Sequence, residues 1–239
     1  MKQRASYGID APGAVRANIG LAAVFAVIAA IGFALPSHFP LSASIGAAFL
    51  AALCFFYGAA MLWSSLVGKK RVCERLIAAL ALAPDEQVLD AGCGRGLALI
   101  GCAKKLTTGK ATGIDLWAAK DQSNNNPEAT MANAAMESVA SRVDVKTGDI
   151  TKLPFADASF DAVISMTVLH NIPSQPGRDQ AIRELVRVLK PGGRLAIYDL
   201  MHTARYREVL QGAGMTVQVL SRNFLWLLPS RSLLARKPA

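Results

Sequence analysis

Charge is missing from a long stretch of this chain. Between Ala17 and Gly68 there is no aspartate, glutamate, lysine or arginine. Charged residues make up only 18% of the 239 residues and hydrophobic residues 52%, which is rich in apolar residues for a soluble enzyme. The apolar excess is local, and it indicates a membrane component beside an ordinary folded domain.

Cysteine and histidine are also scarce. There are four cysteines, with no Cys-x-x-Cys pair and no nearby histidine, so the sequence suggests neither a zinc site nor a disulfide framework and agrees with a reducing cytosol. The net charge of +9 is concentrated in a basic patch, Lys69, Lys70, Arg71 and Arg75, directly after the apolar stretch. No exposed aromatics alternate with these cations, so we expect contact with anionic lipid and not with nucleic acid.

The uncharged stretch predicts a hairpin of two membrane-spanning helices. Residues 36–40 (Pro-Ser-His-Phe-Pro) divide it into apolar helices of about 18–35 and 42–66. The first is barely long enough for a hydrocarbon core of about 30 Å, and the second crosses it with tilt. Basic residues flank the outer ends and none lies in the turn, which places both termini and the folded domain in the cytosol. We therefore expect an interfacial segment over 1–16, a hairpin over 17–68 and a domain over 69–239.

Small residues recur at every fourth position in both apolar segments, at Ala22, Ala26 and Ala30, and at Ser42 and Gly46. Such spacing lets helix backbones approach closely in lipid, either within the hairpin or in a homodimer. Two other interpretations remain open. The first segment could be a cleaved signal peptide, and the two helices could instead cover the active site of a soluble protein.

The remainder of the chain alternates between predicted strands and helices. After an amphipathic helix over 71–82, we expect strands at about 88–91, 110–115, 143–147, 162–166, 194–198, 215–220 and 232–235. Helices at about 95–106, 126–140, 178–189 and 204–213 separate them. This alternation predicts an α/β fold with a doubly wound, parallel sheet.

A glycine turn follows the first of these strands. Gly92, Gly94 and Gly96 remove the side chains that would keep a ligand from the backbone, where a helix N-terminus offers free N–H groups. Asp115 closes the next strand, at about the distance expected of an acidic residue that binds ribose hydroxyls. The alternative is a structural turn with a surface aspartate, because this Gly-x-Gly-x-Gly spacing is a weak signal alone.

Five motifs together resemble class I S-adenosylmethionine-dependent methyltransferases, and most closely the ubiquinone and menaquinone C-methyltransferase type. They are Val88–Gly96, Gly113–Asp115, Gly148–Phe155, Phe160–Ser165 and Leu189–Leu195. The resemblance covers about 87–200. It implies a seven-stranded Rossmann-like sheet with the last strand antiparallel, and S-adenosyl-L-methionine as the cofactor. The hairpin is foreign to the soluble quinone enzymes.

The resemblance also implies roles for individual residues. It places the methionine end of the cofactor over Asp90, Gly92 and Gly94, and the ribose on Asp115, which Leu116 follows. The remaining three positions are Asp149 at the adenine amino group, Ile150 beside the adenine ring and Ser165 at a strand end below the methionine portion. No metal ligands are implied. Family members that methylate planar nitrogens carry Asn-Pro-Pro-aromatic after the fourth strand, whereas residues 165–168 are Ser-Met-Thr-Val, which disfavours nucleobase chemistry.

His170 is the candidate general base, because it follows the fourth strand at the mouth of the expected site. The alternative is that it caps the following turn. Weaker candidates for closing the site or contacting the acceptor are Trp117, Asp121 and Gln122 in one loop, Tyr7 and Asp10 as a lid, and Tyr198 and His202.

Two functions follow from these patterns. The first is a membrane-anchored methyltransferase of the cytoplasmic membrane whose acceptor is lipophilic, such as a quinone precursor, a lipid amine or a small hydrophobic thiol. The second is a membrane-bound sensor or scaffold that binds S-adenosylmethionine without transferring its methyl group.

Overall fold

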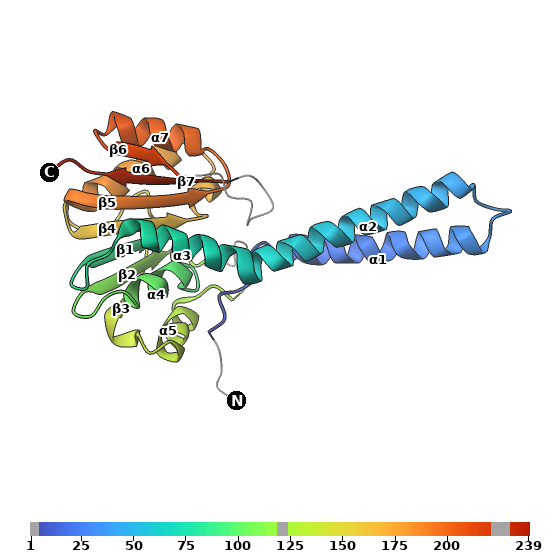
Figure 1. The fold of residues 1–239 in the computed structure, drawn as a ribbon, viewed down its shortest axis with the longest axis horizontal. Helices are drawn as coiled ribbons and strands as arrows, with labels where there is room; N and C mark the ends of the chain where they lie inside the picture. Colours follow the sequence, from blue (N-terminus) through green and yellow to red (C-terminus); the bar gives the residue numbers. More distant parts are fainter. Residues whose placement is uncertain (1–4, 119–123, 221–229) are drawn as a thin grey trace.

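The computed structural model describes residues 5–118, 124–220 and 230–239. It shows a long helical hairpin that extends away from a domain built around a seven-stranded sheet (Figure 1). The hairpin consists of α1 (Pro12–Ala34) and α2 (Leu41–Trp63). The strands are β1 (Gln87–Ala91), β2 (Lys110–Asp115), β3 (Val143–Thr147), β4 (Phe160–Met166), β5 (Leu189–Asp199), β6 (Thr216–Val219) and β7 (Arg231–Arg236). The domain helices are α3 (Lys69–Leu80), α4 (Leu97–Ala103), α5 (Pro127–Met136), α6 (Gln175–Val188) and α7 (Thr203–Gly212).

The strand order is β3-β2-β1-β4-β5-β7-β6. Strands β1 to β5 pair in parallel, and β7 runs antiparallel to both of its neighbours. This confirms the predicted α/β class, the seven strands and the antiparallel last strand. The chain moves outward from β1 to β3 and then returns to β4, so the order reverses between β1 and β4, where ligands of such sheets bind.

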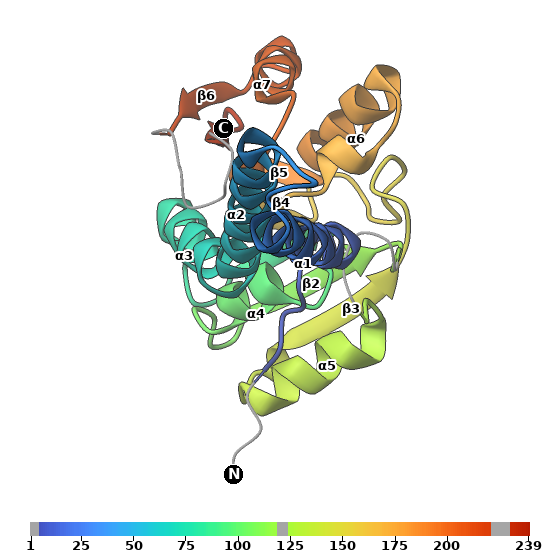
Figure 2. The same ribbon diagram turned by 90° about the vertical axis from the view of Figure 1, so that its right-hand side faces the viewer.

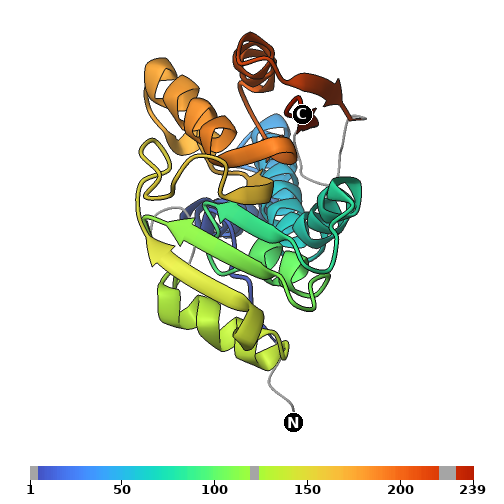
Figure 3. The same ribbon diagram turned by 90° about the vertical axis from the view of Figure 1, so that its left-hand side faces the viewer.

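Helices cover both faces of the sheet and enclose two apolar layers. One layer joins α3 and α4 to the sheet through residues such as Leu76, Leu99 and Val88. The other joins α6 and α7 to the sheet through Leu185, Leu210 and their neighbours. Viewed down the hairpin, α1 and α2 lie in front of the sheet (Figure 2), and from the opposite side they lie behind it (Figure 3).

Local sequence signals explain where several elements begin. The side chain of Asn126 accepts a hydrogen bond of 2.7 Å from the backbone N–H of Ala129, and Pro127 occupies the first turn of α5, as predicted. Helix α6 begins at Gln175, three residues before the predicted start, because Ser174 Oγ accepts from Gly177 N and caps it. Helix α1 begins at Pro12, six residues before the predicted start at about 18, so residues 12–16 of the predicted interfacial segment are helical.

Helix α2 does not end where the apolar stretch ends. A π-helical turn, η1 (Ser64–Gly68), joins it directly to α3, so the helix is continuous from Leu41 to Leu80. The predicted helices over 42–66 and 71–82 are therefore one continuous helix. Along it, the sequence changes from apolar on all sides to amphipathic. Such π turns inside long helices are frequent at functional sites.

The two hairpin helices pack through small residues, but only partly through the predicted ones. The buried residues of the hairpin are Val15, Ala22, Ala29 and Gly32 of α1 and Ser44, Ala47 and Gly58 of α2. A Cβ atom added to Gly32 would lie 3.2 Å from Cβ of Ser44, so this crossing requires glycine. The other predicted positions, Ala26, Ala30, Ser42 and Gly46, are exposed and do not contribute to packing within the hairpin. Whether those exposed positions support a homodimer stays a prediction.

Both hairpin helices are long and apolar enough to cross a membrane. The most apolar window of the first has a mean hydropathy of 2.2 and that of the second 2.1, with only 17% and 11% of each window buried. The core helix of a soluble protein would be mostly buried, and these are not. The hairpin therefore leaves a large apolar surface without a cover in the described chain.

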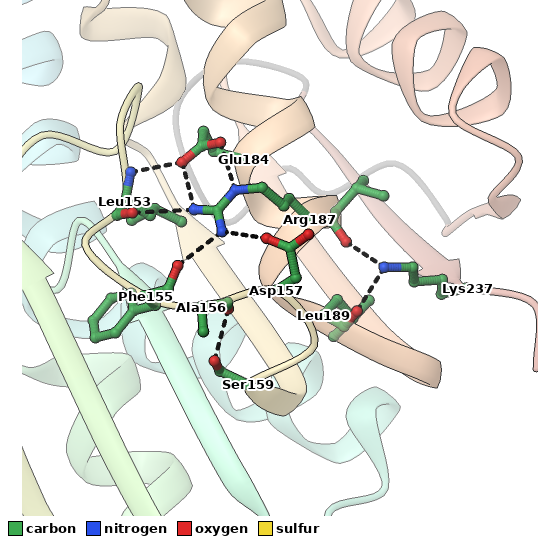
Figure 4. A network of polar contacts seen from close by, with 10 residues as sticks. Leu153, Phe155, Ala156, Asp157, Ser159, Glu184, Arg187, Leu189 and Lys237 are labelled. Atoms are coloured by element: carbon green, nitrogen blue, oxygen red, sulfur yellow. Dashed lines mark hydrogen bonds and ion pairs between the residues drawn. The ribbon is translucent and has the colours of Figure 1, made fainter.

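One polar network fixes the loop between β3 and β4 to α6 (Figure 4). The guanidinium of Arg187 donates to the backbone oxygens of Leu153 and Phe155 and to the carboxylates of Asp157 and Glu184, at 2.8 to 3.1 Å. Glu184 in turn accepts from the backbone N–H of Leu153 at 2.7 Å. Arg187 and this backbone bond hold the pKa of Glu184 below its usual value. The network anchors the turn that begins at Asp149.

Candidate active site

A cavity of about 640 Å³ lies at the carboxyl ends of the parallel strands, at the β1–β4 reversal. This volume is ordinary for a site that takes a drug-sized ligand. Seven of the eight predicted cofactor residues line it, and so does the candidate base: Asp90, Gly92, Gly94, Asp115, Leu116, Asp149, Ile150 and His170. The glycine turn, the acidic strand ends and the histidine therefore share one site.

The glycine turn needs glycine for two reasons. Gly92 and Gly94 have φ angles of 82° and 48°, in the left-handed region that side chains disfavour. A Cβ atom on Gly92 would also overlap both methyl groups of Val168. The backbone N–H of Gly92 donates to the carbonyl of Ile114 at 2.8 Å, which ties the turn to β2. The turn is a rigid and bare wall of the cavity.

Asp90 presents an unpartnered carboxylate oxygen to this cavity. Its side chain is 2% exposed, and Oδ2 has no hydrogen-bond partner in the described chain. Burial raises the pKa of Asp90 to about 7, and the nearby carboxylate of Asp115 contributes in the same direction. A buried acceptor without a donor is costly, so this oxygen is suited to a donor supplied by a ligand, above all a cationic amine.

Asp115 is held in a fixed orientation by backbone donors. Oδ2 accepts from Gly94 N at 2.8 Å and Oδ1 from Trp117 N at 2.6 Å. Each carboxylate oxygen has two lone pairs, so acceptor capacity remains for ligand hydroxyls. Asn125 donates to Oδ1 at 3.3 Å, and its own side-chain oxygen is buried without a partner at the same cavity. This corner therefore offers several acceptors.

The adenine side of the predicted site is formed by Asp149 and Ile150. Asp149 Oδ1 accepts from Thr151 N at 2.8 Å, which closes the turn, and Ile150 is 6% exposed with its side chain in the core. The Arg187 network holds the residues that follow. Asp149 and Ile150 thus provide a polar and an apolar surface side by side.

His170 forms a dyad with Asp199, a residue that the sequence analysis did not single out. Nδ1 of His170 lies 2.5 Å from Oδ1 of Asp199, and the backbone N–H of His170 donates to Oδ2 at 3.0 Å. Asp199 is 1% exposed and also accepts from Leu200 N and Tyr206 Oη. A carboxylate that accepts from Nδ1–H leaves Nε2 unprotonated, as a base requires. His170 faces the cavity and Asp199 orients it.

Three predicted candidates do not lie on the cavity wall. Ser165 is 1% exposed and its hydroxyl donates to the carbonyl of Ala91 at 2.9 Å, so it fastens β4 to β1 beneath the cavity. Tyr198 is buried, with its hydroxyl 2.6 Å from that of Ser230. His202 is exposed beside the ring of Tyr206. These residues have structural or surface positions in the described chain, and their direct roles in binding stay predictions.

The loop candidates have different outcomes. Trp117 is turned away from the cavity, because its indole N–H donates to Thr147 Oγ1 at 2.8 Å. Asp121 and Gln122 lie outside the described residues.

The N-terminal segment folds back onto the domain, as the lid prediction requires. Ser6 exchanges two backbone hydrogen bonds with the side chain of Asn133, and Tyr7 Oη donates to Glu137. Asp10 and the following Ala11 line the cavity. We refer to residues 5–11 as the N-terminal strap.

Lys69 fastens this strap. Its ammonium donates to the carbonyls of Tyr7 and Gly8 at 2.8 and 2.7 Å and to Asp10 Oδ1 at 3.2 Å. Its side chain is only 4% exposed, and burial lowers its pKa. Lys69 is therefore not part of a lipid-binding basic patch, and that part of the prediction is wrong. Lys70, Arg71 and Arg75 are exposed.

The base of the hairpin closes the remaining side of the cavity. Tyr57 and Met61 of α2 and Ser64 and Ser65 of η1 line the same space as Asp90 and His170. Sequence reasoning could not find this wall, since it depends on where the hairpin docks.

The comparison with known sequences decides the class of the domain. Residues 89–197 match the family described as "Methyltransferase domain". This part of the chain is therefore similar to S-adenosylmethionine-dependent methyltransferases. The match begins in β1 and ends in β5, so it contains the glycine turn, both acidic strand ends and His170.

Curated relatives of this methyltransferase domain act on different molecules, according to their names. The chain is 36% identical over 159 residues to a 27-O-demethylrifamycin SV methyltransferase of Amycolatopsis mediterranei, covering 62% of this chain and 55% of that protein. It is 35% identical over 118 residues to the ubiquinone/menaquinone biosynthesis C-methyltransferase UbiE of Geotalea daltonii, covering 49% and 46%. The chain thus spans about half the length of these relatives.

Solved structures share the fold of this domain. A methyltransferase from Aquifex aeolicus, described as S-adenosylmethionine-dependent, superposes with a TM-score of 0.56 at 20% identity, covering 69% of this chain and 88% of the other. The cyclase SpnF superposes with a TM-score of 0.60 at 21% identity, covering 71% and 81%. Because the second is named for another reaction, the fold alone does not fix the chemistry.

Proposed function

We propose that this protein is a membrane-anchored methyltransferase that transfers a methyl group from S-adenosylmethionine to a lipophilic acceptor. One observation carries the proposal: the cavity that contains the methyltransferase motifs is also walled by the base of an uncovered apolar hairpin. The acceptor class comprises quinone precursors, lipid amines and small hydrophobic thiols. The anchor would concentrate such acceptors where the site opens.

The residues of the cavity suit this cofactor. Asp90 has the free carboxylate oxygen that a cationic amino group needs. Asp115 Oδ2 keeps one lone pair and Asn125 Oδ1 has no partner in the described chain, so these two side chains together can accept from two hydroxyls. Asp149 and Ile150 offer a polar edge and an apolar face to a purine. When bound, S-adenosylmethionine supplies a methyl group that its sulfonium already makes electrophilic.

The protein itself positions the reactants and removes a proton from the acceptor. The glycine turn and strand ends fix one reactant, and the surrounding wall excludes water, which accounts for much of the catalysis in such transfers. His170 accepts the acceptor's proton at Nε2, while Asp199 holds the ring and stabilises the imidazolium that forms. An acceptor with an O–H, S–H or N–H group benefits most from this dyad.

The membrane topology follows from the charge distribution. The exposed Lys70, Arg71 and Arg75 lie at the domain end of the hairpin, and residues 35–41 at the tip carry no lysine or arginine. The positive-inside rule then places the domain and both termini in the cytosol, with the hairpin in the cytoplasmic membrane. The exposed apolar residues of α1 and α2 face lipid in this arrangement.

Methyl transfer in membranes tests this function. Membranes that contain the full chain are incubated with methyl-tritiated S-adenosylmethionine and a lipid extract, and label is counted in the organic phase. The proposal predicts labelled lipid or quinone, absent from matched membranes carrying His170→Gln. Cofactor binding without any transfer would instead identify a sensor or scaffold.

A further inference from the structure

We propose that the base of the hairpin is the acceptor subsite, in which Tyr57, Met61 and Ser64 bind an amphiphile that has an apolar chain and a neutral hydroxyl head. The apolar chain of the amphiphile lies against Tyr57 and Met61, and its hydroxyl head lies between Ser64 and His170. This inference rests on the proposed function and identifies the part of the protein that selects the methyl acceptor.

The spacing of these residues puts them on one side of one helix. Tyr57, Met61, Ser64 and Ser65 follow one another at intervals of four, three and one residues, which keeps them on a single helical face. That face lines the cavity, whereas the neighbouring Phe55 and Phe56 are 63% and 68% exposed and do not. Helix α2 therefore separates a lipid-facing side from a side that belongs to the active site.

Apolar residues of the domain complete this part of the cavity. Val168, Ile172 and Pro173 follow β4, and Leu200 follows β5, so they come from the strand ends that also carry His170 and Asp199. The acidic cofactor residues come from β1, β2 and the turn after β3, on the other side of the reversal. We therefore treat the side with the acidic residues as the polar half of the cavity and the side with β4 and β5 as its apolar half, and we assign the base of the hairpin to the apolar half.

Ser64 provides a polar anchor in the apolar half. Its residue is 2% exposed, and Oγ has no hydrogen-bond partner in the described chain although it lines the cavity. The adjacent Ser65 differs, because its Oγ accepts from Asp10 N at 3.1 Å and holds the strap. An orphaned hydroxyl in a mainly apolar wall is suited to a donor or acceptor on a bound molecule.

The nearest cation of the same helix does not favour an anionic head. Lys69 has three ammonium protons and uses them on two carbonyls of the strap and on Asp10. A phosphate would have to displace the strap to reach it. A neutral hydroxyl on the ligand can therefore form hydrogen bonds with Ser64 and His170, whereas a phosphate would have no free lysine on this helix to bind.

Photochemical labelling tests the subsite without measuring activity. The full chain is reconstituted in phosphatidylcholine vesicles with a long-chain alkylphenol that carries a diazirine on its chain, then irradiated and mapped by mass spectrometry. We expect adducts concentrated on residues 57–65 and saturable by unlabelled alkylphenol. Met61→Trp should fill the subsite and reduce the saturable labelling about tenfold, while Phe56→Trp, on the lipid side of the same helix, should not change it.

A second pair of variants tests the head contact. Ser64→Ala should lower the affinity for the alkylphenol several-fold, because one hydrogen bond is lost. Ser42→Ala, an exposed serine near the start of α2, should leave it unchanged. Labelling spread evenly along α1 and α2, or unaltered by both Met61→Trp and Ser64→Ala, would overturn the subsite.

Cofactor binding separates the two proposals. Calorimetry with S-adenosylhomocysteine should give the same Kd for wild type, Met61→Trp and Ser64→Ala, since these residues belong to the acceptor half. If methyl transfer to lipid occurs and Met61→Trp does not impair it, the subsite is wrong and the proposed function stands. If no transfer to lipid occurs in the wild type, the proposed function is wrong.

Discussion

His170 and Asp199 are joined twice, through the imidazole Nδ1 and through the backbone N–H of the histidine. His170 follows β4 and Asp199 is the last residue of the neighbouring β5, and only the histidine reaches the cavity. The carboxylate is further fixed by Leu200 N and Tyr206 Oη. These contacts fix the orientation of the His170 imidazole, which is the proposed base.

Removing either member of the dyad should slow transfer without weakening cofactor binding. We expect His170→Gln to lower kcat about 100-fold or more, and Asp199→Asn to lower it less, because Asp199 acts through the histidine. Transfer rates and the Kd for S-adenosylhomocysteine measure these effects. His202→Gln, at an exposed histidine, is the matched control. Unchanged kcat in His170→Gln would leave the histidine only its turn-capping role.

Asp90 should make the stability of the free protein depend on pH. Its pKa is raised to about 7 in the folded state, so between about 4 and 7 the native protein binds the proton that the unfolded chain releases. The free energy of unfolding therefore falls as the pH rises from about 4 to about 7, because folding then opposes the ionisation of Asp90. Asp90→Asn should therefore unfold at a higher denaturant concentration than wild type at pH 8, and the difference should vanish near pH 4.

The same substitution should damage the site. An ionised Asp90 is needed to accept a cationic amine, so the affinity of wild type for S-adenosylhomocysteine should rise as pH increases through about 7. Asp90→Asn should bind weakly and lose this pH dependence, as measured by calorimetry. Identical binding profiles for the two proteins would remove Asp90 from the site.

Asp115→Ala should weaken cofactor binding about 10-fold to 100-fold, since charge-assisted hydrogen bonds to ligand hydroxyls are lost. It also removes the acceptor for Gly94 N and Trp117 N, which loosens the glycine turn. Asp144→Ala, on the exposed edge of the neighbouring strand β3, is the control. Equal affinity in both variants would show that Asp115 only shapes the turn.

Gly92→Ala should destabilise the fold by about 1–3 kcal/mol, because the left-handed φ is disfavoured and the new methyl group overlaps Val168. Adding Val168→Ala removes the overlap but not the backbone strain, so the double variant should recover part of the loss. Chemical denaturation of the full chain in detergent measures both. No recovery would mean that the overlap is not the cause.

The hairpin topology can be checked with thiol labelling. In a Cys54→Ser background, Ser37→Cys at the tip should react with a membrane-impermeant maleimide in intact cells. Ser141→Cys, exposed on the domain, should react only after the cells are opened. The other three cysteines are buried and should not react with the maleimide. Reaction of both positions from outside, or of neither, would contradict the proposed topology.

Local patterns were enough to predict most of the fold. Strands β2 and β3 have the predicted bounds, because apolar alternation and the adjacent glycines mark them, and Asn126 with Pro127 marks α5. The residues proposed to hold the cofactor were identified through the resemblance of five motifs to a methyltransferase family. These features are encoded within short stretches of the chain.

Features that need distant partners were not predictable. Lys69 is polar in sequence, and only the strap carbonyls, some sixty residues away, explain its burial. The change from apolar to amphipathic pattern at 64–70 suggested a helix boundary, but the backbone bonds continue through the π turn. Asp199 could have been found, because β5 lies beside β4 and its last residue reaches the edge where His170 stands.

The most direct test of the central claim is a crystal or cryo-electron microscopy structure of the full chain with S-adenosylhomocysteine. We expect the amino group at Asp90 Oδ2, the ribose at Asp115 and the adenine beside Ile150, with the space toward Tyr57, Met61 and His170 left open for an acceptor. A ligand bound elsewhere, or one that fills the space against the hairpin, would contradict the account.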